Sequence, residues 1–193
     1  MSRPRDEMLK LSDPRQMRAL AHPLRLRLLG LLRSDGPSTA SALGEEVGSS
    51  PALVSYHLRT LASHGLIEES PGLARDGRER WWRSTHSGMT WNPADFLDTP
   101  ERSAAAGALM GEIAERYADA AREWLADAPS WSADWVDAAD MSDWRLRLTP
   151  DAARALRADL IEVIERYEAA SHDDGAELVR LIVHVLPRRP RAR

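Results

Sequence analysis

A tight turn between two short amphipathic stretches constrains the fold of this chain more than any other feature. Residues 40–47 have the length and pattern of a short helix, and Gly48 ends it. Ser50 and Pro51 then supply a side-chain cap and a first-turn proline for a second helix, which continues to residue 64. Because only three residues separate the two helices, the sequence predicts that they form a helix-turn-helix.

The second of these helices has two faces that its spacing separates. The positions at i, i+3, i+4 and i+7 that we expect to face the core are Val54, His57, Leu58 and Leu61. The positions at the same intervals on another face are Ala52, Ser55, Tyr56 and Arg59. This second face is small, hydroxylic and cationic, with no large aliphatic side chain.

Such a face suits the major groove of DNA. Small residues at the helix N-terminus permit close approach, and polar tips then reach the edges of the bases. Arg59 can pair with guanine or with a phosphate, and the free N–H groups near Ser50 can hold a phosphate. The alternative is an ordinary amphipathic helix with a solvated polar face, and this helix alone does not separate the two interpretations.

A basic hairpin is predicted directly after the helix. Residues 66–69 and 80–83 have the pattern of two short strands, and residues 70–78 between them are rich in turn formers. The cations at or beside the tip are Arg75, Arg78 and Arg80. A hairpin of this kind can press into the backbone or the minor groove of a duplex, and its presence favours nucleic-acid binding.

Three ordered motifs within residues 12–90 resemble those of the arsenic-repressor-type (ArsR-like) winged-helix family. They are MRALAHPLRLRLL at residues 17–29, SYHLRTLASHGLI at residues 55–67 and GRERWWR at residues 77–83. The resemblance implies a homodimeric repressor that an inducer releases from its operator. By position, it implies that the DNA-facing residues are Pro51, Ala52, Ser55, Tyr56 and Arg59.

The chain departs from that family in two respects. It contains no cysteine, so sensing of a metal through a thiolate pair is excluded. It is also longer than the near-minimal domain of the family. We therefore predict a winged helix-turn-helix domain at residues 1–92 and a separate dimerisation or effector domain at residues 93–193.

The residue pattern of 93–193 predicts an α+β domain with long helices. With the winged helix before it, the whole chain is predicted to be mainly α with a small β content. We expect helices at 103–127 and 150–170, strands at 144–148 and 178–186, and an irregular loop at 129–140. The long helix around residues 105–124 is the candidate dimer seam. The side chains that could line an apolar effector pocket, or simply pack a core, are Trp124, Trp131, Trp135 and Trp144. The arginine-rich tail at 188–193 could add phosphate contacts or lie free in solvent.

Composition limits the function classes that remain. Residues 1–92 hold 13 basic and 10 acidic side chains, a net charge of +3, whereas residues 93–193 hold 13 and 20, a net charge of −7. Only the first half is therefore expected to meet phosphates. We see no catalytic set, nucleotide loop, metal site, cofactor motif, secretory signal or membrane span, so we expect a cytoplasmic protein that is not an enzyme.

Taken together, the sequence predicts a homodimeric transcription regulator that binds double-stranded DNA sequence-specifically. We expect a repressor released by a small organic effector. The alternative is a winged-helix module that binds another protein and has no sequence-specific DNA binding.

Overall fold

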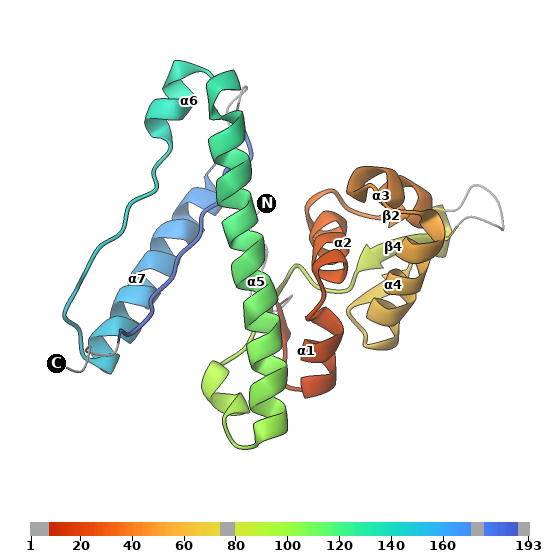
Figure 1. The fold of residues 1–193 in the computed structure, drawn as a ribbon, viewed down its shortest axis with the longest axis horizontal. Coiled ribbons are helices and arrows are strands. Elements are labelled where there is room, and N and C mark those ends of the chain that lie inside the picture. The colour runs from red at the N-terminus through yellow and green to blue at the C-terminus, as the bar shows by residue number, and fades with distance from the viewer. Residues whose placement is uncertain (1–7, 74–79, 171–175, 189–193) are drawn as a thin grey trace. The chain divides into compact units, whose positions relative to one another are not determined.

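The computed structural model describes residues 8–73, 80–170 and 176–188 (Figure 1). The chain divides into two compact units between Trp124 and Leu125. The boundary falls inside the long helix α5 (Pro100–Asp127), so the predicted boundary at residues 92 and 93 lies within the first unit.

The first unit opens with four helices, and three of them begin at a side-chain cap followed by proline. The four helices are α1 (Pro14–Leu20), α2 (Pro23–Ser34), α3 (Ala40–Val47) and α4 (Pro51–Ser63). The caps of α1, α2 and α4 are Asp13, His22 and Ser50, and each accepts a hydrogen bond from a backbone N–H in the first turn. The predicted positions of α3 and α4 are confirmed.

Two small sheets accompany the helices. The strands β2 (Ser38–Thr39), β4 (Trp81–Ser84) and β3 (Ile67–Glu69) form an antiparallel sheet in that order. The strands β1 (Met8–Lys10) and β5 (Gly88–Thr90) pair in parallel. The hairpin of β3 and β4 is as predicted, whereas the sequence analysis did not identify β1, β2 or β5. Short 3-10 helices lie at Pro71–Leu73 and Pro93–Phe96.

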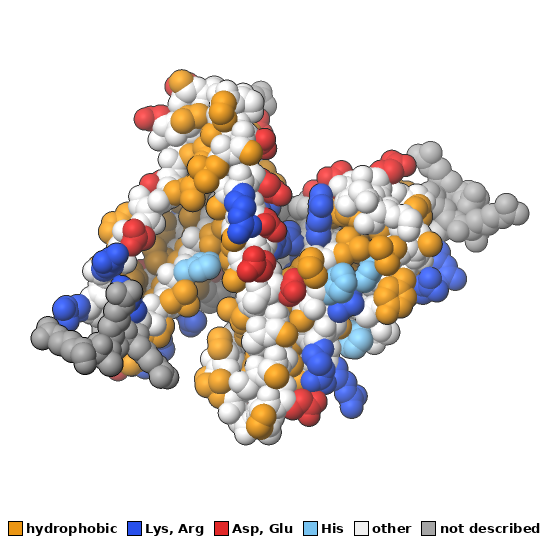
Figure 2. Space-filling model, viewed as in Figure 1, with side chains coloured by type: hydrophobic (Ala, Val, Ile, Leu, Met, Phe, Trp, Pro, Cys, Tyr) orange, Lys and Arg blue, Asp and Glu red, His pale blue; other side chains and the backbone are white. Residues whose placement is uncertain are grey.

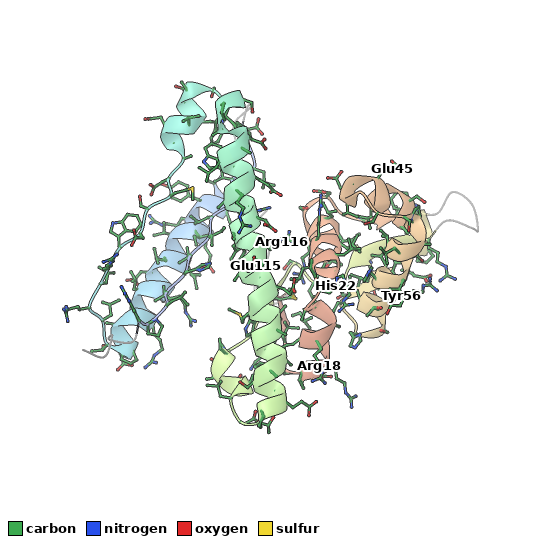
Figure 3. All side chains as sticks on the ribbon, in the orientation of Figure 1. Arg18, His22, Glu45, Tyr56, Glu115 and Arg116 are labelled. Atoms are coloured by element: carbon green, nitrogen blue, oxygen red, sulfur yellow. The ribbon has the colours of Figure 1, made fainter. Side chains whose placement is uncertain are left out.

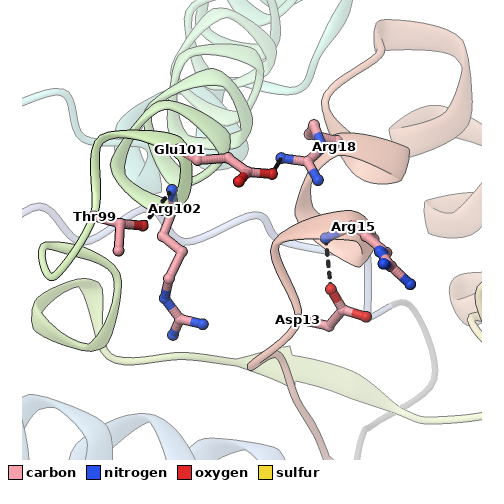
Figure 4. A network of polar contacts seen from close by, with 6 residues as sticks. All are labelled: Asp13, Arg15, Arg18, Thr99, Glu101 and Arg102. Carbon is pink, nitrogen blue, oxygen red and sulfur yellow. Dashed lines mark hydrogen bonds and ion pairs between the residues drawn. The ribbon is translucent and has the colours of Figure 1, made fainter.

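Helix α5 packs on the helices before it through a shared core. Leu109 and Ala105 of α5 are buried with Phe96, the last residue of the 3-10 helix that precedes α5. A guanidinium N–H of Arg116 donates to the carbonyl oxygen of Leu26 at 2.7 Å, which links α5 to α2 (Figure 3). Figure 4 shows a second link, the ion pair of Arg18 and Glu101 at 3.1 Å.

The second unit contains the end of α5, a 3-10 helix at Ala128–Ser130, α6 (Ala133–Ala138) and α7 (Pro150–Ala169). The helix expected at 150–170 is confirmed. The irregular loop expected at 129–140 is wrong in part, because Ser132 caps α6 within it. A single turn-and-a-half of helix is too short to show a clear apolar period, so its cap was the only sequence signal.

The two strands predicted in the second unit are also wrong for the chain by itself. Residues 144–148 and 178–186 form neither helix nor strand, and no sheet in the described residues includes them. Alternation of apolar and polar residues predicts which faces a strand would have, but a strand also needs a neighbour that satisfies its backbone N–H and C=O groups. The overall class, mainly α with small sheets, is confirmed. Among the described helices, none combines the length and apolar character of a membrane span.

Candidate nucleic-acid interface

The turn between α3 and α4 is tight enough to require two glycines. Gly48 adopts a φ of +64°, in the left-handed region that other residues disfavour. A Cβ atom on Gly44 would lie 2.7 Å from the carbonyl oxygen of Ser49, well inside contact distance. The N–H of Ser49 donates to the carbonyl oxygen of Gly44 at 2.9 Å. The backbone of the turn therefore lies directly on α3 and fixes the direction in which α4 leaves.

One face of α4 is fully committed to the core, as predicted. Its buried residues are Val54, His57, Leu58 and Leu61. At the start of the helix, the hydroxyl oxygen of Ser50 accepts a hydrogen bond from the N–H of Leu53 at 3.3 Å. These contacts leave α4 no freedom to rotate about its axis without exposing apolar side chains.

The opposite face of α4 meets solvent. Ala52, Tyr56 and Arg59 are exposed, with Tyr56 at 59% of its full accessibility, and Ser55 is half-buried. Ser50 and Pro51 at the start of the helix are exposed as well. The Nε of Arg59 donates to the carbonyl oxygen of Ser55 at 3.1 Å, which holds the guanidinium along the helix. Leu53 is also exposed, and the spacing argument did not mark it.

Two histidines meet beneath this face. The rings of His22 and His57 lie 4.5 Å apart between centroids, and Tyr56 packs edge-on against His57 at 5.2 Å. Figure 2 shows histidine side chains gathered beside apolar ones over α2 and α4. Nδ1 of His22 accepts a hydrogen bond from the N–H of Leu24, whereas Nδ1 of His57 is buried without a hydrogen-bond partner in the described residues.

Burial lowers the pKa of both histidines. For His57, the neighbouring His22 and Arg25 lower the pKa further. For His22, Arg25 also lowers the pKa, while Glu112 of α5 opposes the shift. Both rings are therefore held in the neutral form more strongly than in an unfolded chain. His57 is buried, as its position on the helix predicts. Its ring contact with His22 was not predictable, because spacing along one helix does not show which residue of another helix packs against it.

The hairpin carries acidic partners for its cations. Arg83 and Glu68 oppose each other in the register of β3 and β4, and their side chains form an ion pair at 2.6 Å. Arg80 pairs with Glu69 at 3.2 Å, and both side chains are largely exposed. Arg75 and Arg78 lie outside the described residues. The sequence analysis did not pair Glu68 and Glu69 with these arginines. The predicted hairpin was the signal for it, because opposite charges on neighbouring strands tend to pair.

Two of the four tryptophans lie together in the second unit. The rings of Trp131 and Trp135 meet at 6.1 Å in the second unit, beside an open hollow that is lined by Ala128, Pro129, Trp131, Ala133, Val136 and Asp137. Trp144 is 76% exposed and does not line this hollow. Trp124 is half-buried and belongs to the first unit.

Comparison with known proteins supports the helix-turn-helix assignment. Residues 20–70 match a family of helix-turn-helix domains, and this stretch contains α2, α3 and α4. The match lies inside residues 12–90, where the resemblance to winged-helix regulators was found, and confirms it there. No curated protein matches the chain.

Several solved structures match the chain at low overall similarity. A possible transcriptional regulator for arsenical resistance is 28% identical over 51% of this chain and 82% of its own, with a TM-score of 0.32. A MarR family regulator from Neisseria meningitidis is 22% identical over 75% of each chain, with a TM-score of 0.31. Lactococcus lactis ZitR, in a complex with DNA, is 16% identical over 75% of this chain and 74% of its own, with a TM-score of 0.31.

Proposed function

We propose that this chain is a homodimeric transcription regulator that binds double-stranded DNA sequence-specifically through α4. We further propose that it acts in the cytoplasm as a repressor and that a small organic effector releases it. The observation that carries the proposal is the exposed face of α4, formed by Ala52, Tyr56 and Arg59 on a helix whose opposite face is locked into the core.

Each residue of this face has a distinct part in the proposal. Ala52 allows the helix to approach the floor of the major groove, and Tyr56 and Ser55 offer hydroxyls to base edges or phosphates. Arg59 supplies the bidentate group that recognises guanine. A phosphate is proposed to lie at the positive N-terminal end of the helix, beside Ser50 and Pro51.

The hairpin adds contacts of a different kind. Arg75, Arg78 and Arg80 are proposed to contact the sugar-phosphate backbone or the minor groove, where their contribution is mainly electrostatic. The ion pair of Arg80 with Glu69 is exposed, so a phosphate can compete for the guanidinium at small cost.

A dimer follows from the size of the recognition surface. One helix contacts few base pairs, whereas two copies reach half-sites about 34 Å apart and multiply their discrimination. The proposed seam is the part of α5 between residues 105 and 124. Since Ala105 and Leu109 are buried inside the first unit, the face of α5 left for a partner is the one that presents Met110 and Tyr117.

The proposed effector is an organic molecule with an apolar, flat group. The chain has no thiolate, and the described residues contain no cluster of three or more His, Asp or Glu side chains that could hold a metal. The hollow beside Trp131 and Trp135 is the candidate site, because indole walls suit flat ligands. Trp124 and Trp144 remain candidates for the same role.

Selection of preferred sequences from random duplexes, followed by gel retardation, tests the proposal. Arg59→Ala should weaken binding to the selected duplex by about 1–3 kcal/mol and relax specificity at one position. The matched control is Arg154→Ala, on α7, where the arginine pairs with Asp151 of its own helix. An equal loss on selected and random duplexes would mean that Arg59 touches phosphate alone.

The hairpin is tested through the salt dependence of binding. Removal of Arg75 and Arg78 should reduce the slope of log affinity against log salt by about 2, because roughly one counterion is released per phosphate contact. If the intact protein ignores every duplex at low salt, the proposal is wrong and the alternative of a protein-binding module is favoured.

A further inference from the structure

Residues 178–186, near the end of the described chain, form an apolar run that belongs to no helix or strand. Its sequence is LVRLIVHVL, and no sheet in the described part of the chain includes it. Seven of its nine side chains are large, aliphatic and exposed, and Leu178 is 94% exposed. In water, a run of this kind is unstable unless another surface covers it.

The unit that contains this run has no interior of its own. Between residues 125 and 188, no residue that the structure describes is buried. Of the 24 large hydrophobic side chains that are exposed in the described residues, 17 lie from Leu125 onward. Figure 2 shows such side chains at the surface around α6. A stable interface uses about 20–30 residues on each side, so this unit carries enough apolar surface for the core of one.

An extended backbone would sort the run into two distinct faces. One face would hold only aliphatic side chains, which are Val179, Leu181, Val183 and Val185. The other face would hold Leu178, Arg180, Ile182, His184 and Leu186. One fully apolar and one mixed face are typical of a strand in a sheet that is covered on one side.

We propose that residues 178–186 pair, as an antiparallel strand, with the same residues of a second copy of this chain. The twofold axis passes at Ile182. This inference rests on the homodimer of the proposed function and specifies how its two second units join. Antiparallel strands related by a twofold axis present the same surface to each other, which is the geometry that a symmetric dimer requires.

The register follows from the two faces. In an antiparallel pair, directly opposed residues point to the same side of the sheet. The aliphatic face consists of odd-numbered residues, so the two aliphatic faces coincide only when each odd-numbered residue opposes another odd-numbered residue. Centring the pair on Ile182 is the even register that pairs all nine residues. It places Leu181 opposite Val183 and Leu178 opposite Leu186.

Charge favours a second copy as the occupant of this surface. The run contains no acidic residue, although the second half of the chain is acidic overall. Its one arginine, Arg180, falls opposite His184 in the proposed register and not opposite another arginine. Two copies can therefore pair without repulsion between like charges across the strands, which would destabilise the pair.

The absence of cysteine from the chain allows a direct test by cross-linking. In the full-length chain, Ile182→Cys places each new thiol opposite its own copy, with Cα atoms about 4.5–5.5 Å apart, within the range for a disulfide. We expect mild oxidation to convert this variant to a covalent dimer on a non-reducing gel.

The matched control is Leu178→Cys. In the proposed register its two copies stand eight residues apart along the strand, about 27 Å at 3.4 Å per residue, so it should not cross-link alone. It should cross-link when mixed and exchanged with Leu186→Cys, which it opposes. Cross-linking of Leu178→Cys alone as fast as Ile182→Cys, or none by Ile182→Cys, overturns the proposal.

A second measurement does not depend on cysteine chemistry. Leu181→Asp places two carboxylates in the aliphatic face and should raise the dimer dissociation constant, measured by sedimentation equilibrium, by about 100-fold or more. Arg180→Gln, on the mixed face, should change it by less than about fivefold. Equal dissociation constants for Leu181→Asp and the unaltered chain overturn the strand pairing.

These outcomes are separate from those of the proposed function. A cross-linked Ile182→Cys dimer that ignores all DNA would contradict the proposed function and leave the strand pairing standing. If the chain binds its selected duplex in gel retardation but Ile182→Cys fails to cross-link, the strand pairing is contradicted and the proposed function stands.

Discussion

Replacement of Gly44 by alanine tests whether the geometry of the turn between α3 and α4 controls both stability and DNA binding. Gly44 is a helical residue with no requirement for positive φ, so alanine is not excluded by backbone conformation. The obstacle is space, because the new Cβ would lie 2.7 Å from the carbonyl oxygen of Ser49. That atom is backbone and cannot rotate away as a side chain would.

The magnitude follows from three terms. Relief of the clash requires a movement of about 0.7 Å to reach ordinary contact, and overpacking of this kind costs about 1–3 kcal/mol. The movement strains the bond from the N–H of Ser49 to the carbonyl oxygen of Gly44, worth about 1 kcal/mol. Alanine recovers about 1 kcal/mol through its higher helix propensity. The expected net loss is about 1–3 kcal/mol.

Urea unfolding followed by far-ultraviolet circular dichroism measures this loss. The control is Gly107→Ala on α5, where an added Cβ meets nothing within 4 Å, and which should stabilise the chain by about 0.5–1 kcal/mol. If Gly44→Ala stabilises the chain as much as Gly107→Ala does, the turn is not as tight as the structure indicates. In Gly44→Ala, loss of binding to the selected duplex should accompany the loss of stability.

Two further predictions concern titration and charge. Because the fold lowers the pKa of His57 and His22 below the ordinary value of 6.5, the unfolded chain binds protons more readily, so stability present above pH 6.5 should decline as the pH falls below it. Urea unfolding at pH 7.5 and 5.5 measures the decline, which His57→Gln should reduce. Glu69→Gln frees Arg80 for phosphate, and should raise affinity for random duplex by about two- to fivefold at low salt.

Each of these predictions has an outcome that opposes it. Equal free energies of unfolding at the two pH values would show that the two rings titrate in the fold as they do in an unfolded chain. For the hairpin, Asp151→Asn on α7 changes the net charge equally, at a distance in sequence from β3 and β4. If both amide variants raise the affinity alike, the effect belongs to net charge and not to Arg80.

The sequence was most informative where local chemistry decides the structure. A side-chain cap, a first-turn proline and a terminal glycine located α3 and α4, because each of these signals acts within one turn of the helix that it begins or ends. The buried and exposed faces of α4 followed from its period. Ser55 is the partial exception, since it lies at the edge of the exposed face and is half-buried.

Features that depend on distant parts of the chain were not predictable in the same way. β1 and β5 are three residues each and are 77 or more residues apart, so neither carries a period that reveals it. The contact of His22 with His57 joins α2 to α4, and nothing in either helix alone specifies it. The same holds for Arg116, whose hydrogen bond to Leu26 spans 90 residues.

The two predicted strands of the second unit expose a different limit. Their alternating residues describe the environment that the segments need, with water on one side and apolar contact on the other, but not which chain provides it. A helix satisfies its own backbone, and α7 accordingly forms within the single chain. A strand forms its backbone hydrogen bonds with a neighbouring strand. Residues 178–186 have the pattern of a strand, but no described sheet of the single chain includes them. Its nine residues can all pair with a copy of themselves in a register that keeps the aliphatic faces together. The pattern that failed to predict a strand in one chain is therefore better explained as a property of two.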